Sequence, residues 1–288
     1  MTLAAIYRFP VKGLRGESLP SVDVDAGGGL PHDRRFALAR GGDGTNSAAH
    51  PWRPKQRFAI LMRDAELARL ACRVDFDAGT IELGVPGEPP CVAAFASGPG
   101  RGALETYVNR VLGGRVAGPL RLVEAGPLSL TDVPENCLSI INLDSVHDLE
   151  ARIGAPVHPL RFRGNLLIAG AGPWAEFDWV GREIQVGGVR LRVHTRIPRC
   201  AATAVDPDTA ERNLNVVKAL KAGYGHVDMG VYAEVLAGGR LAVGDALVTP
   251  ETPRPRSRLG HELRFLRFLA RSVRILFSRR VRARPRGA

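Results

Sequence analysis

A ten-residue segment, Gly188–Ile197, alternates between apolar and polar side chains more regularly than the rest of the chain. Val189, Leu191 and Val193 occupy every second position, and basic side chains stand between them. Successive side chains of a β-strand point to opposite faces, so this pattern predicts a half-buried strand with one apolar and one basic face. The chain must therefore build a sheet that has an apolar interior.

Further short apolar segments, separated by turn residues, are also predicted to be strands. The chain contains 33 glycines and 21 prolines without a repeat period, which favours many turns between short strands. Two helices are predicted: Ala103–Leu112, and a second that begins after Asn142 as its N-cap. The predicted fold class is mainly β with a few helices. The other segments predicted to be strands are Leu3–Phe9, Ser21–Asp25, Arg35–Arg40, Phe58–Met62, Ala71–Phe76, Thr80–Val85, Leu138–Ile141, Leu166–Ala169 and, with an internal Gly-Asp turn, Leu241–Val248.

The net charge of +11 belongs mostly to one end of the chain. From Glu251 onward there are twelve arginines, no lysine and two acids, which account for ten of the eleven net charges. The preceding residues lack the basic surface of a nucleic-acid-binding protein, so we expect no nucleic acid partner. We divide the chain into an N-terminal domain, residues 1–120, a second domain, residues 121–250, and a basic tail, residues 251–288.

Within the tail, Arg264, Arg267, Arg271 and Arg274 are spaced 3, 4 and 3 residues apart, which places them in one stripe of a helix. Apolar side chains cover most of the remaining surface, and charges recur too often for a membrane-spanning helix. The pattern predicts an amphipathic helix that binds an anionic membrane surface through residues 255–288. Packing against the rest of the protein or a protein partner, and disorder, are the alternatives.

The four cysteines, Cys72, Cys91, Cys137 and Cys200, lie far apart in the sequence. This spacing argues against a zinc or iron–sulfur site made of cysteines alone. The N-terminus enters a strand-like segment at once, without the basic start and apolar core of a signal peptide. These features predict a cytoplasmic protein with free thiols, associated with a membrane only through its tail.

Cys200 has the surroundings of a reactive or metal-binding thiol. It follows the basic strand, where Pro198 ends the strand and Arg199 places a positive charge beside the thiol. A fixed positive charge favours the thiolate, which is both a nucleophile and a soft metal ligand. One alternative is a buried, inert cysteine. Another is a Cys–His hydrolase, because His194 lies six residues earlier.

Several polar residues outside the tail are suited to bind an anion. Arg163 and Asn165 lie on one side of an extended segment, and Lys12 follows Pro10 in a defined direction. Together with the basic face of the strand, they offer guanidinium, ammonium and amide groups to a phosphate or to the edge of a heterocycle. The alternatives are a solvated outer face, a salt-bridged loop and an exposed lysine.

Five stretches of the chain together resemble one protein family. They are IYRFPVKGLRGESL at the start, DRRFAL at 33–38, RFRGNLLIAG with WAEFDWVGREIQVG at 161–187, RCAATAVDPDT at 199–209 and GVYAEVLAGGRLAVGDAL at 230–247. In this order they resemble the MOSC (molybdenum cofactor sulfurase C-terminal) proteins that carry an N-terminal β-barrel domain. The amidoxime-reducing and N-hydroxylaminopurine-detoxifying members look most similar. The resemblance implies a MOSC-type β-barrel core preceded by a second β-barrel domain.

The resemblance also implies roles for individual residues. Cys200 falls on the cysteine that ligates molybdenum and is the implied catalytic residue. Gly13 and Pro198 depart from the family pattern, which has a serine after the lysine and a small polar residue two before the cysteine. Asn142 is a weaker candidate. The implied contacts to the cofactor's pterin and phosphate come from Lys12, Arg35, Arg163, Asn165, Arg199 beside the thiol, and the late aromatic Tyr232.

The function implied by the resemblance is that of a molybdenum-dependent oxidoreductase that binds a Mo-pyranopterin cofactor. Its reaction would be two-electron reduction of an N–O bond in a small N-hydroxylated substrate. Electrons would come from an external donor protein, because the sequence has no GxGxxG dinucleotide motif and no four-cysteine ferredoxin module. Two alternatives remain: a carrier that holds the cofactor or a persulfide on Cys200 without turnover, and a β-barrel scaffold or membrane adaptor without a cofactor.

Overall fold

The computed structural model describes residues 1–41, 54–126 and 128–249 of the chain, and residues 1–250 form one compact unit. Strands predominate, with three α-helices among the described residues, so the predicted fold class is confirmed. Within the same ranges, no helix is both long and apolar enough to cross a bilayer. The predicted tail helix in residues 255–288 lies outside the described residues.

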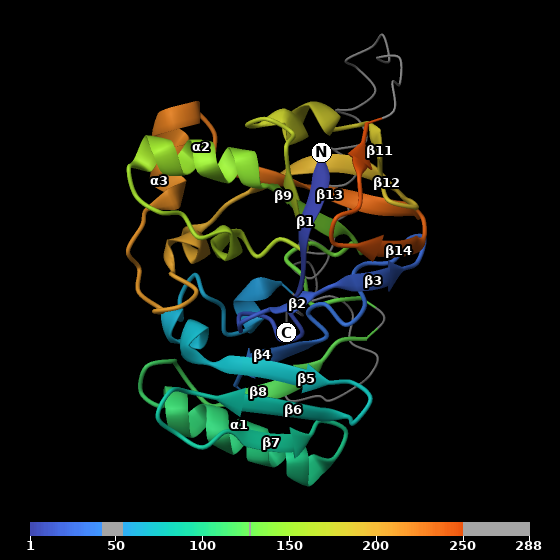
Figure 1. The fold of residues 1–288 in the computed structure, drawn as a ribbon. Helices are drawn as coiled ribbons and strands as arrows, with labels where there is room; N and C mark the ends of the chain where they lie inside the picture. The colour runs from blue at the N-terminus through green and yellow to red at the C-terminus, as the bar shows by residue number, and fades with distance from the viewer. Residues whose placement is uncertain (42–53, 127, 250–288) are drawn as a thin grey trace, which may run out of the picture. The chain divides into compact units, whose positions relative to one another are not determined.

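The larger sheet curls back on itself. Its strand order is β15-β11-β12-β13-β9-β10-β1-β2, and all neighbours are antiparallel except the parallel pair β9 and β10 (Figure 1). An isolated bridge between Thr2 and Ala246 connects β1 to the residues before β15 and brings the two sides of the sheet together. The strands are β1 (Thr2–Arg8), β2 (Glu17–Leu19), β9 (Leu138–Asn142), β10 (Leu166–Ala169), β11 (Glu183–Val186), β12 (Val189–Pro198), β13 (Asp228–Ala237) and β15 (Leu247–Val248).

Strand β12 has the two faces that its alternating sequence predicts. Val189, Leu191 and Val193 are fully buried and pack in the apolar core of the larger sheet. On the opposite face, Arg192 Nη2 lies 2.8 Å from Glu183 Oε1 on the neighbouring strand. The basic face is therefore a salt-bridged outer surface of the sheet.

The N-terminal part of the chain contributes smaller sheets around an apolar core of their own. Leu38, Leu83 and Leu104 are buried in this core, and the helix that carries Leu104 packs against three of the strands. Figure 1 shows this helix and the three-stranded sheet next to one another. The elements are β4 (Phe36–Arg40), paired with β8 (Leu120–Glu124); the sheet β5 (Ala71–Asp75), β6 (Thr80–Gly84) and β7 (Cys91–Ala94); and helix α1 (Gly98–Leu112). A separate pair, β3 (Ser21–Val24) and β14 (Gly239–Ala242), packs in the core of the larger sheet through Val24 and Leu241.

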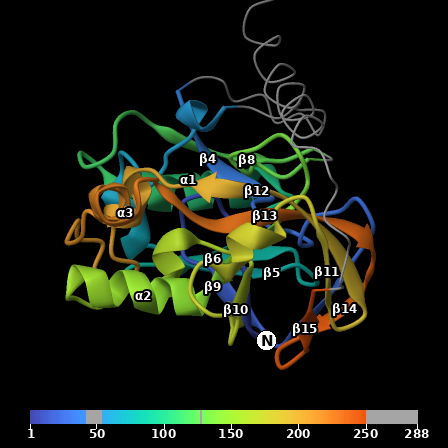
Figure 2. The same ribbon diagram turned by 90° about the horizontal axis from the view of Figure 1, so that it is seen from above.

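Two helices lie side by side next to the larger sheet in both views (Figures 1 and 2). Helix α2 (Leu143–Ile153) begins at the predicted N-cap, where Asn142 Oδ1 accepts a hydrogen bond from Asp144 N at 3.1 Å. Gly154 ends it in the left-handed conformation, with φ 72°. Its neighbour α3 (Val216–Tyr224) is absent from the sequence prediction.

The predicted strand over residues 58–62 is wrong. Only Phe58 takes part in a bridge, to Ala39, and the chain then turns. Asp64 drives the turn, because its Oδ2 accepts a hydrogen bond from Ile60 N at 3.0 Å and its own N–H donates to the Ile60 carbonyl at 2.9 Å. Local side-chain bonding of this kind competes with strand pairing.

The larger sheet contains strands from both ends of the described chain. β1 and β2 come from the first nineteen residues, whereas the other six strands follow residue 137. The domain boundaries predicted near residues 120 and 250 stay predictions, and strands from both sides of the first boundary share one sheet.

Candidate functional site

A cavity of about 290 Å³ opens where β12 ends, close to the turn after β1 and the turn before β10. Its wall is formed by residues from widely separated parts of the chain. Six of the seven residues expected at the site line it: Lys12, Arg163, Asn165, Arg199, Cys200 and Tyr232. The structure thus brings these six together; the seventh, Arg35, is not in the wall.

Cys200 lies on the cavity wall immediately beyond β12. Its carbonyl accepts hydrogen bonds from Thr203 N at 3.1 Å and Thr203 Oγ1 at 2.9 Å, which start a short 3-10 helix, Ala201–Ala204. Cys137 lies on the same wall, but burial raises the pKa of its thiol to about 12, so it stays protonated. Burial also raises the pKa of the Cys72 thiol to about 12, and Cys72 is not part of the cavity wall. Neither Cys137 nor Cys72 is therefore suited to act as a thiolate ligand.

Arg163 lines the cavity and carries an unsatisfied donor. Its Nη1 donates to the Leu14 carbonyl at 2.7 Å, but its buried Nη2 has no hydrogen-bond partner within the described structure. Burial lowers the pKa of the guanidinium to about 9, which reflects a positive charge with too little compensation. A buried donor without a partner is unfavourable, so an anion in the cavity would stabilise Arg163.

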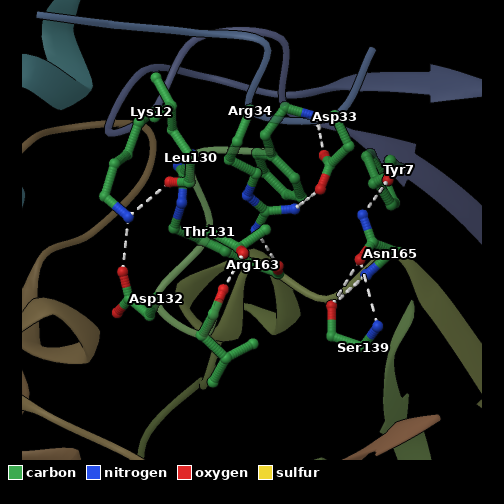
Figure 3. A network of polar contacts seen from close by, with 12 residues as sticks. Tyr7, Lys12, Asp33, Arg34, Leu130, Thr131, Asp132, Ser139, Arg163 and Asn165 are labelled. Carbon is green, nitrogen blue, oxygen red and sulfur yellow. Dashed lines mark hydrogen bonds and ion pairs between the residues drawn. The ribbon is translucent and has the colours of Figure 1, made fainter. Parts of the chain in front are cut away.

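Arg34, not Arg35, reaches the cavity. Arg34 Nη2 donates to the Arg163 carbonyl at 2.8 Å, and Nη1 bonds to the Asp33 carboxylate (Figure 3). Arg35 Nη2 instead lies 2.7 Å from Glu124 Oε1. The left-handed conformation of Arg34, φ 49°, sets this direction one residue earlier than the sequence analysis expected, and nothing in the sequence pattern marks that turn.

The Phe9 ring packs against both Arg34 and Arg163. The guanidinium carbon of Arg34 lies 4.5 Å from the centre of the Phe9 ring, and that of Arg163 lies 4.3 Å from it. Both distances are typical of cation–π contacts. The ring therefore fixes both planar groups against one apolar surface.

Arg199 uses its guanidinium to hold the backbone around Cys200. Its Nε donates to the Met229 carbonyl at 2.8 Å and its Nη1 to the Phe162 carbonyl at 2.9 Å, with a third bond from Nη2 to Met229. Burial lowers its pKa to about 10, against the raising influence of Tyr232 and Cys200. Arg199 thus adds positive charge near the thiol while its donors bond to the chain itself.

The Asn165 amide is likewise engaged by neighbouring residues. Its Oδ1 accepts from Ser139 Oγ at 2.7 Å and its Nδ2 donates to the Tyr7 carbonyl at 3.2 Å (Figure 3). These bonds tie β10 to β9 and β1 beside the cavity. Tyr232 also lines the wall, and burial raises the pKa of its phenol to about 12, so it is a neutral group there.

Lys12, Asp132 and Lys55 form an ion-pair chain on the wall. Lys12 Nζ lies 2.6 Å from Asp132 Oδ1 and Lys55 Nζ lies 3.2 Å from Asp132 Oδ2. Burial disfavours the Asp132 carboxylate, but the two ammonium groups outweigh it and hold its pKa well below the usual range. Sequence analysis missed Asp132 and Lys55, because neither belongs to a segment with a periodic or charge pattern.

The backbone explains the departure from the family pattern at Gly13. Gly13 has φ 86°, a left-handed conformation that favours glycine. A Cβ atom there would lie 3.1 Å from Leu67 Cδ1 and 3.3 Å from the Ala59 carbonyl oxygen. A serine would therefore be strained at this position.

The cavity wall carries an excess of positive charge. Among its described residues, Asp132 is the one carboxylate, against six cations. Such a surface suits an anion with several oxygens, such as a phosphate. No group of three or more His, Cys, Asp or Glu residues in the described ranges could hold a metal ion. The six cations are Lys12, Arg34, Lys55, Arg161, Arg163 and Arg199.

Comparison with known proteins gives two family matches and several partial relatives. The chain is 37% identical over 70 residues to "Mitochondrial amidoxime-reducing component 1" of Mus musculus, covering 24% of this chain and 20% of that protein. It is 34% identical over 77 residues to "Mitochondrial amidoxime reducing component 2" of Homo sapiens, covering 26% and 22%. The matches thus span about a fifth of the length of these curated relatives.

Among solved structures, the YUAD protein from Bacillus subtilis aligns with a TM-score of 0.40 and 13% identity, over 85% of this chain and 93% of that chain. The family matches are more extensive. The model described as MOSC N-terminal beta barrel domain matches residues 1–110, and the model described as MOSC domain matches residues 127–248. The chain therefore belongs to the MOSC-domain proteins that carry an N-terminal MOSC beta barrel domain.

Proposed function

We propose that this protein is an oxidoreductase that binds a Mo-pyranopterin cofactor through Cys200 and reduces small N-hydroxylated substrates. The observation that carries the proposal is that Cys200 and Arg163 lie on the same cavity wall, and that the Arg163 guanidinium keeps a donor without a partner in the described structure. The family supports the cofactor, and the names of the mammalian relatives support the reaction.

The residues present fit such a cofactor. A phosphate needs cationic donors, and Arg163, Arg34 and Lys12 supply them from one wall. A thiolate is a soft ligand of the kind that molybdenum accepts, and Cys200 supplies it. When bound, the cofactor would provide two-electron redox chemistry. In this proposal Arg34 takes the place first expected for Arg35.

The chain's own part in the reaction is binding, orientation and electrostatics. Reduction of an N–OH group takes up two electrons and two protons and releases water. Lys55 keeps its proton, because Asp132 and Cys200 raise its pKa against the effect of burial. Its side chain is 29% exposed, compared with 8% for Lys12, so it lies on the more open side of the cavity. The electrons would come from an external donor protein.

Elemental analysis of the purified wild type and Cys200→Ser tests the proposal. We expect molybdenum in the wild type, its loss in Cys200→Ser, and reduction of an amidoxime by the wild type with a chemical electron donor. A wild type without molybdenum would contradict cofactor binding. Molybdenum without turnover of any amidoxime or N-hydroxylated base would contradict the enzyme proposal and favour a carrier.

We further propose that the protein acts in the cytoplasm and binds anionic membranes through residues 255–288. The arginine stripe in the sequence supports this role. Sedimentation with phosphatidylserine-containing vesicles tests it, with neutral vesicles as the control. The full chain should sediment with the anionic vesicles, and a variant without residues 255–288 should not. Equal binding by both would contradict the proposal.

A further inference from the structure

The segment that follows Cys200 has little secondary structure to hold it in place. After the 3-10 helix Ala201–Ala204, its backbone makes one isolated bridge, between Val205 and Arg212. Cys200 itself is only half-buried. The position of the thiol therefore depends on side chains that reach this segment from elsewhere.

Arg161 reaches it from the cavity side. Its side chain is 1% exposed, and its Nη1 donates to the carbonyls of Ala204 at 3.0 Å and Thr203 at 3.4 Å. Its Nη2 donates to Asp206 Oδ2 at 2.7 Å and Asn213 Oδ1 at 2.6 Å. One buried guanidinium thus holds four points of the chain within thirteen residues of Cys200.

The Asp206 carboxylate completes this arrangement. Its Oδ1 accepts from Asp208 N at 2.9 Å and Thr209 N at 3.1 Å, while its Oδ2 faces Arg161. Burial of Arg161 lowers its pKa, and Asp206 opposes that shift. The ion pair and the turn therefore stabilise one another.

Arg161 and Arg163 lie on the same wall but serve different purposes. The terminal nitrogens of Arg161 all bond to the segment after Cys200, and only its Nε is unsatisfied. Arg163 keeps a buried terminal nitrogen, Nη2, that has no hydrogen-bond partner within the described structure. Arg161 is therefore committed to the chain rather than to a ligand.

We propose that Arg161 is a positioning residue: through Thr203, Ala204 and Asp206 it fixes the backbone after Cys200 and so the place of the thiol in the cavity. The part of this proposal that concerns a metal rests on the proposed function. The part that concerns the thiol does not.

Alkylation of Cys200 in the cofactor-free protein tests the thiol part. Iodoacetamide is added, and modification of the Cys200 peptide is followed by mass spectrometry. Arg161→Lys keeps the charge but cannot hold four acceptors at once, so we expect alkylation about tenfold faster than in the wild type, as the segment opens more often. A wild-type rate in a folded Arg161→Lys protein would overturn the proposal.

Arg15→Lys is the matched control. Arg15 Nη2 donates to the Asp208 carbonyl at 2.9 Å, in the same segment but farther from the thiol. Its alkylation rate should stay within about twofold of the wild type, since the bonds nearest Cys200 are intact. An equally large rate increase in Arg15→Lys would overturn the special role of Arg161.

A second variant removes the side-chain acceptors of Arg161 from the other side. Asp206→Ala combined with Asn213→Ala leaves Arg161 in place with only its bonds to the Thr203 and Ala204 carbonyls, so the buried guanidinium loses its ion pair. This double variant should also accelerate alkylation, and it decides the question if Arg161→Lys does not fold. A wild-type rate in the double variant would then overturn the proposal.

Electron paramagnetic resonance of molybdenum-loaded protein tests the metal part. We expect one Mo(V) signal in the wild type and a broadened or split signal in Arg161→Lys, because the thiolate takes several positions. An unchanged signal would overturn positioning of the metal ligand. A wild type that never takes up molybdenum would overturn the proposed function and leave the alkylation result standing.

Discussion

Arg34 and Arg163 are unusual among the described residues because both hold a long side chain on a left-handed backbone, with φ 49° and 51°. Such a conformation costs about 1–3 kcal/mol for a residue other than glycine and persists only where its surroundings fix it. Here the hydrogen bond from Arg34 to the Arg163 carbonyl and the Phe9 ring fix both. Two of the five described residues other than glycine with positive φ therefore lie on the cavity wall, and both carry positive charge.

Arg163→Met tests whether this charge serves a ligand. Methionine removes the uncompensated charge and the unsatisfied Nη2 while filling a similar volume. We expect the free energy of unfolding of the cofactor-free protein to rise by about 1 kcal/mol in urea titrations. Molybdenum retention should fall at least about tenfold. A variant that is less stable and still retains molybdenum would contradict this role.

Comparison of Arg34→Leu with Arg35→Leu tests which of the two neighbouring arginines contributes to cofactor binding. Arg34→Leu should lower cofactor retention about tenfold or more, because it removes a charged donor from the cavity wall. Arg35→Leu should leave retention near the wild-type value, since its partner is Glu124 outside the wall. Molybdenum content after dialysis measures both. The reverse order of effects would restore the assignment made from the sequence.

At the scale of single residues, most members of the site can be predicted from the sequence, but the direction in which each side chain points cannot. Cys200, Lys12 and Arg163 could be named because short motifs surround them. Arg34 could not, since a single left-handed residue before β4 decides which of two adjacent arginines faces inward. Asp132 and Lys55 meet across 77 residues of sequence, and no local pattern contains that contact.

At the scale of elements, prediction succeeded where one physical signal dominated. The alternation of apolar and polar side chains predicts β12, and Asn142 as the N-cap predicts the start of α2. Both predictions are confirmed. Helix α1 starts at Gly98, five residues earlier than expected, because Ser97 Oγ accepts from Gly100 N at 3.0 Å and caps it. The segments of β8, β11 and β13 were not predicted as strands. β8 and β13 form by pairing with strands distant in the sequence, whereas β11 forms a hairpin with β12.

Glu176 connects three elements next to the larger sheet. This fully buried carboxylate accepts from Asn142 Nδ2 at 2.9 Å and from Ser145 Oγ at 2.9 Å. Burial raises its pKa above the ordinary value, and its hydrogen bonds only partly oppose this. The carboxyl therefore stabilises the fold fully below the glutamate pKa of the unfolded chain, and that contribution is lost as pH rises through the folded pKa.

Glu176→Gln should therefore be less destabilising at neutral pH than at acidic pH. We expect a loss of about 1–3 kcal/mol near the acidic end, where the neutral carboxyl is best accommodated, and a smaller loss at neutral pH. Urea denaturation of both proteins at several pH values measures the difference. A loss that grows with pH would contradict the raised pKa.

At the scale of the whole molecule, the cavity and the larger sheet both combine residues from the two family-matched segments. Lys12 and Arg34 come from the first segment, and Arg163 and Cys200 from the second. The apolar core of the larger sheet likewise includes Leu3 together with residues of the second segment. Neither segment contains the whole site.

A fragment of residues 121–250 should therefore not fold alone. It lacks β1, which pairs with β10, so one edge of a buried sheet would be exposed. We expect no cooperative thermal transition in circular dichroism for the fragment, and a single transition for residues 1–250. A cooperatively folding fragment would show that β1 is dispensable.

The bridge between Thr2 and Ala246 also has a consequence for how the protein is made. At about 5–20 residues per second, a ribosome takes roughly 12–50 s to travel from one of these residues to the other. Until β10, the other strand partner of β1, has been made, the apolar side chains of Leu3 and Ile6, which are fully buried in the finished protein, have only the short strand β2 as a pairing partner. We therefore expect the nascent chain to bind chaperones near the ribosomal exit tunnel.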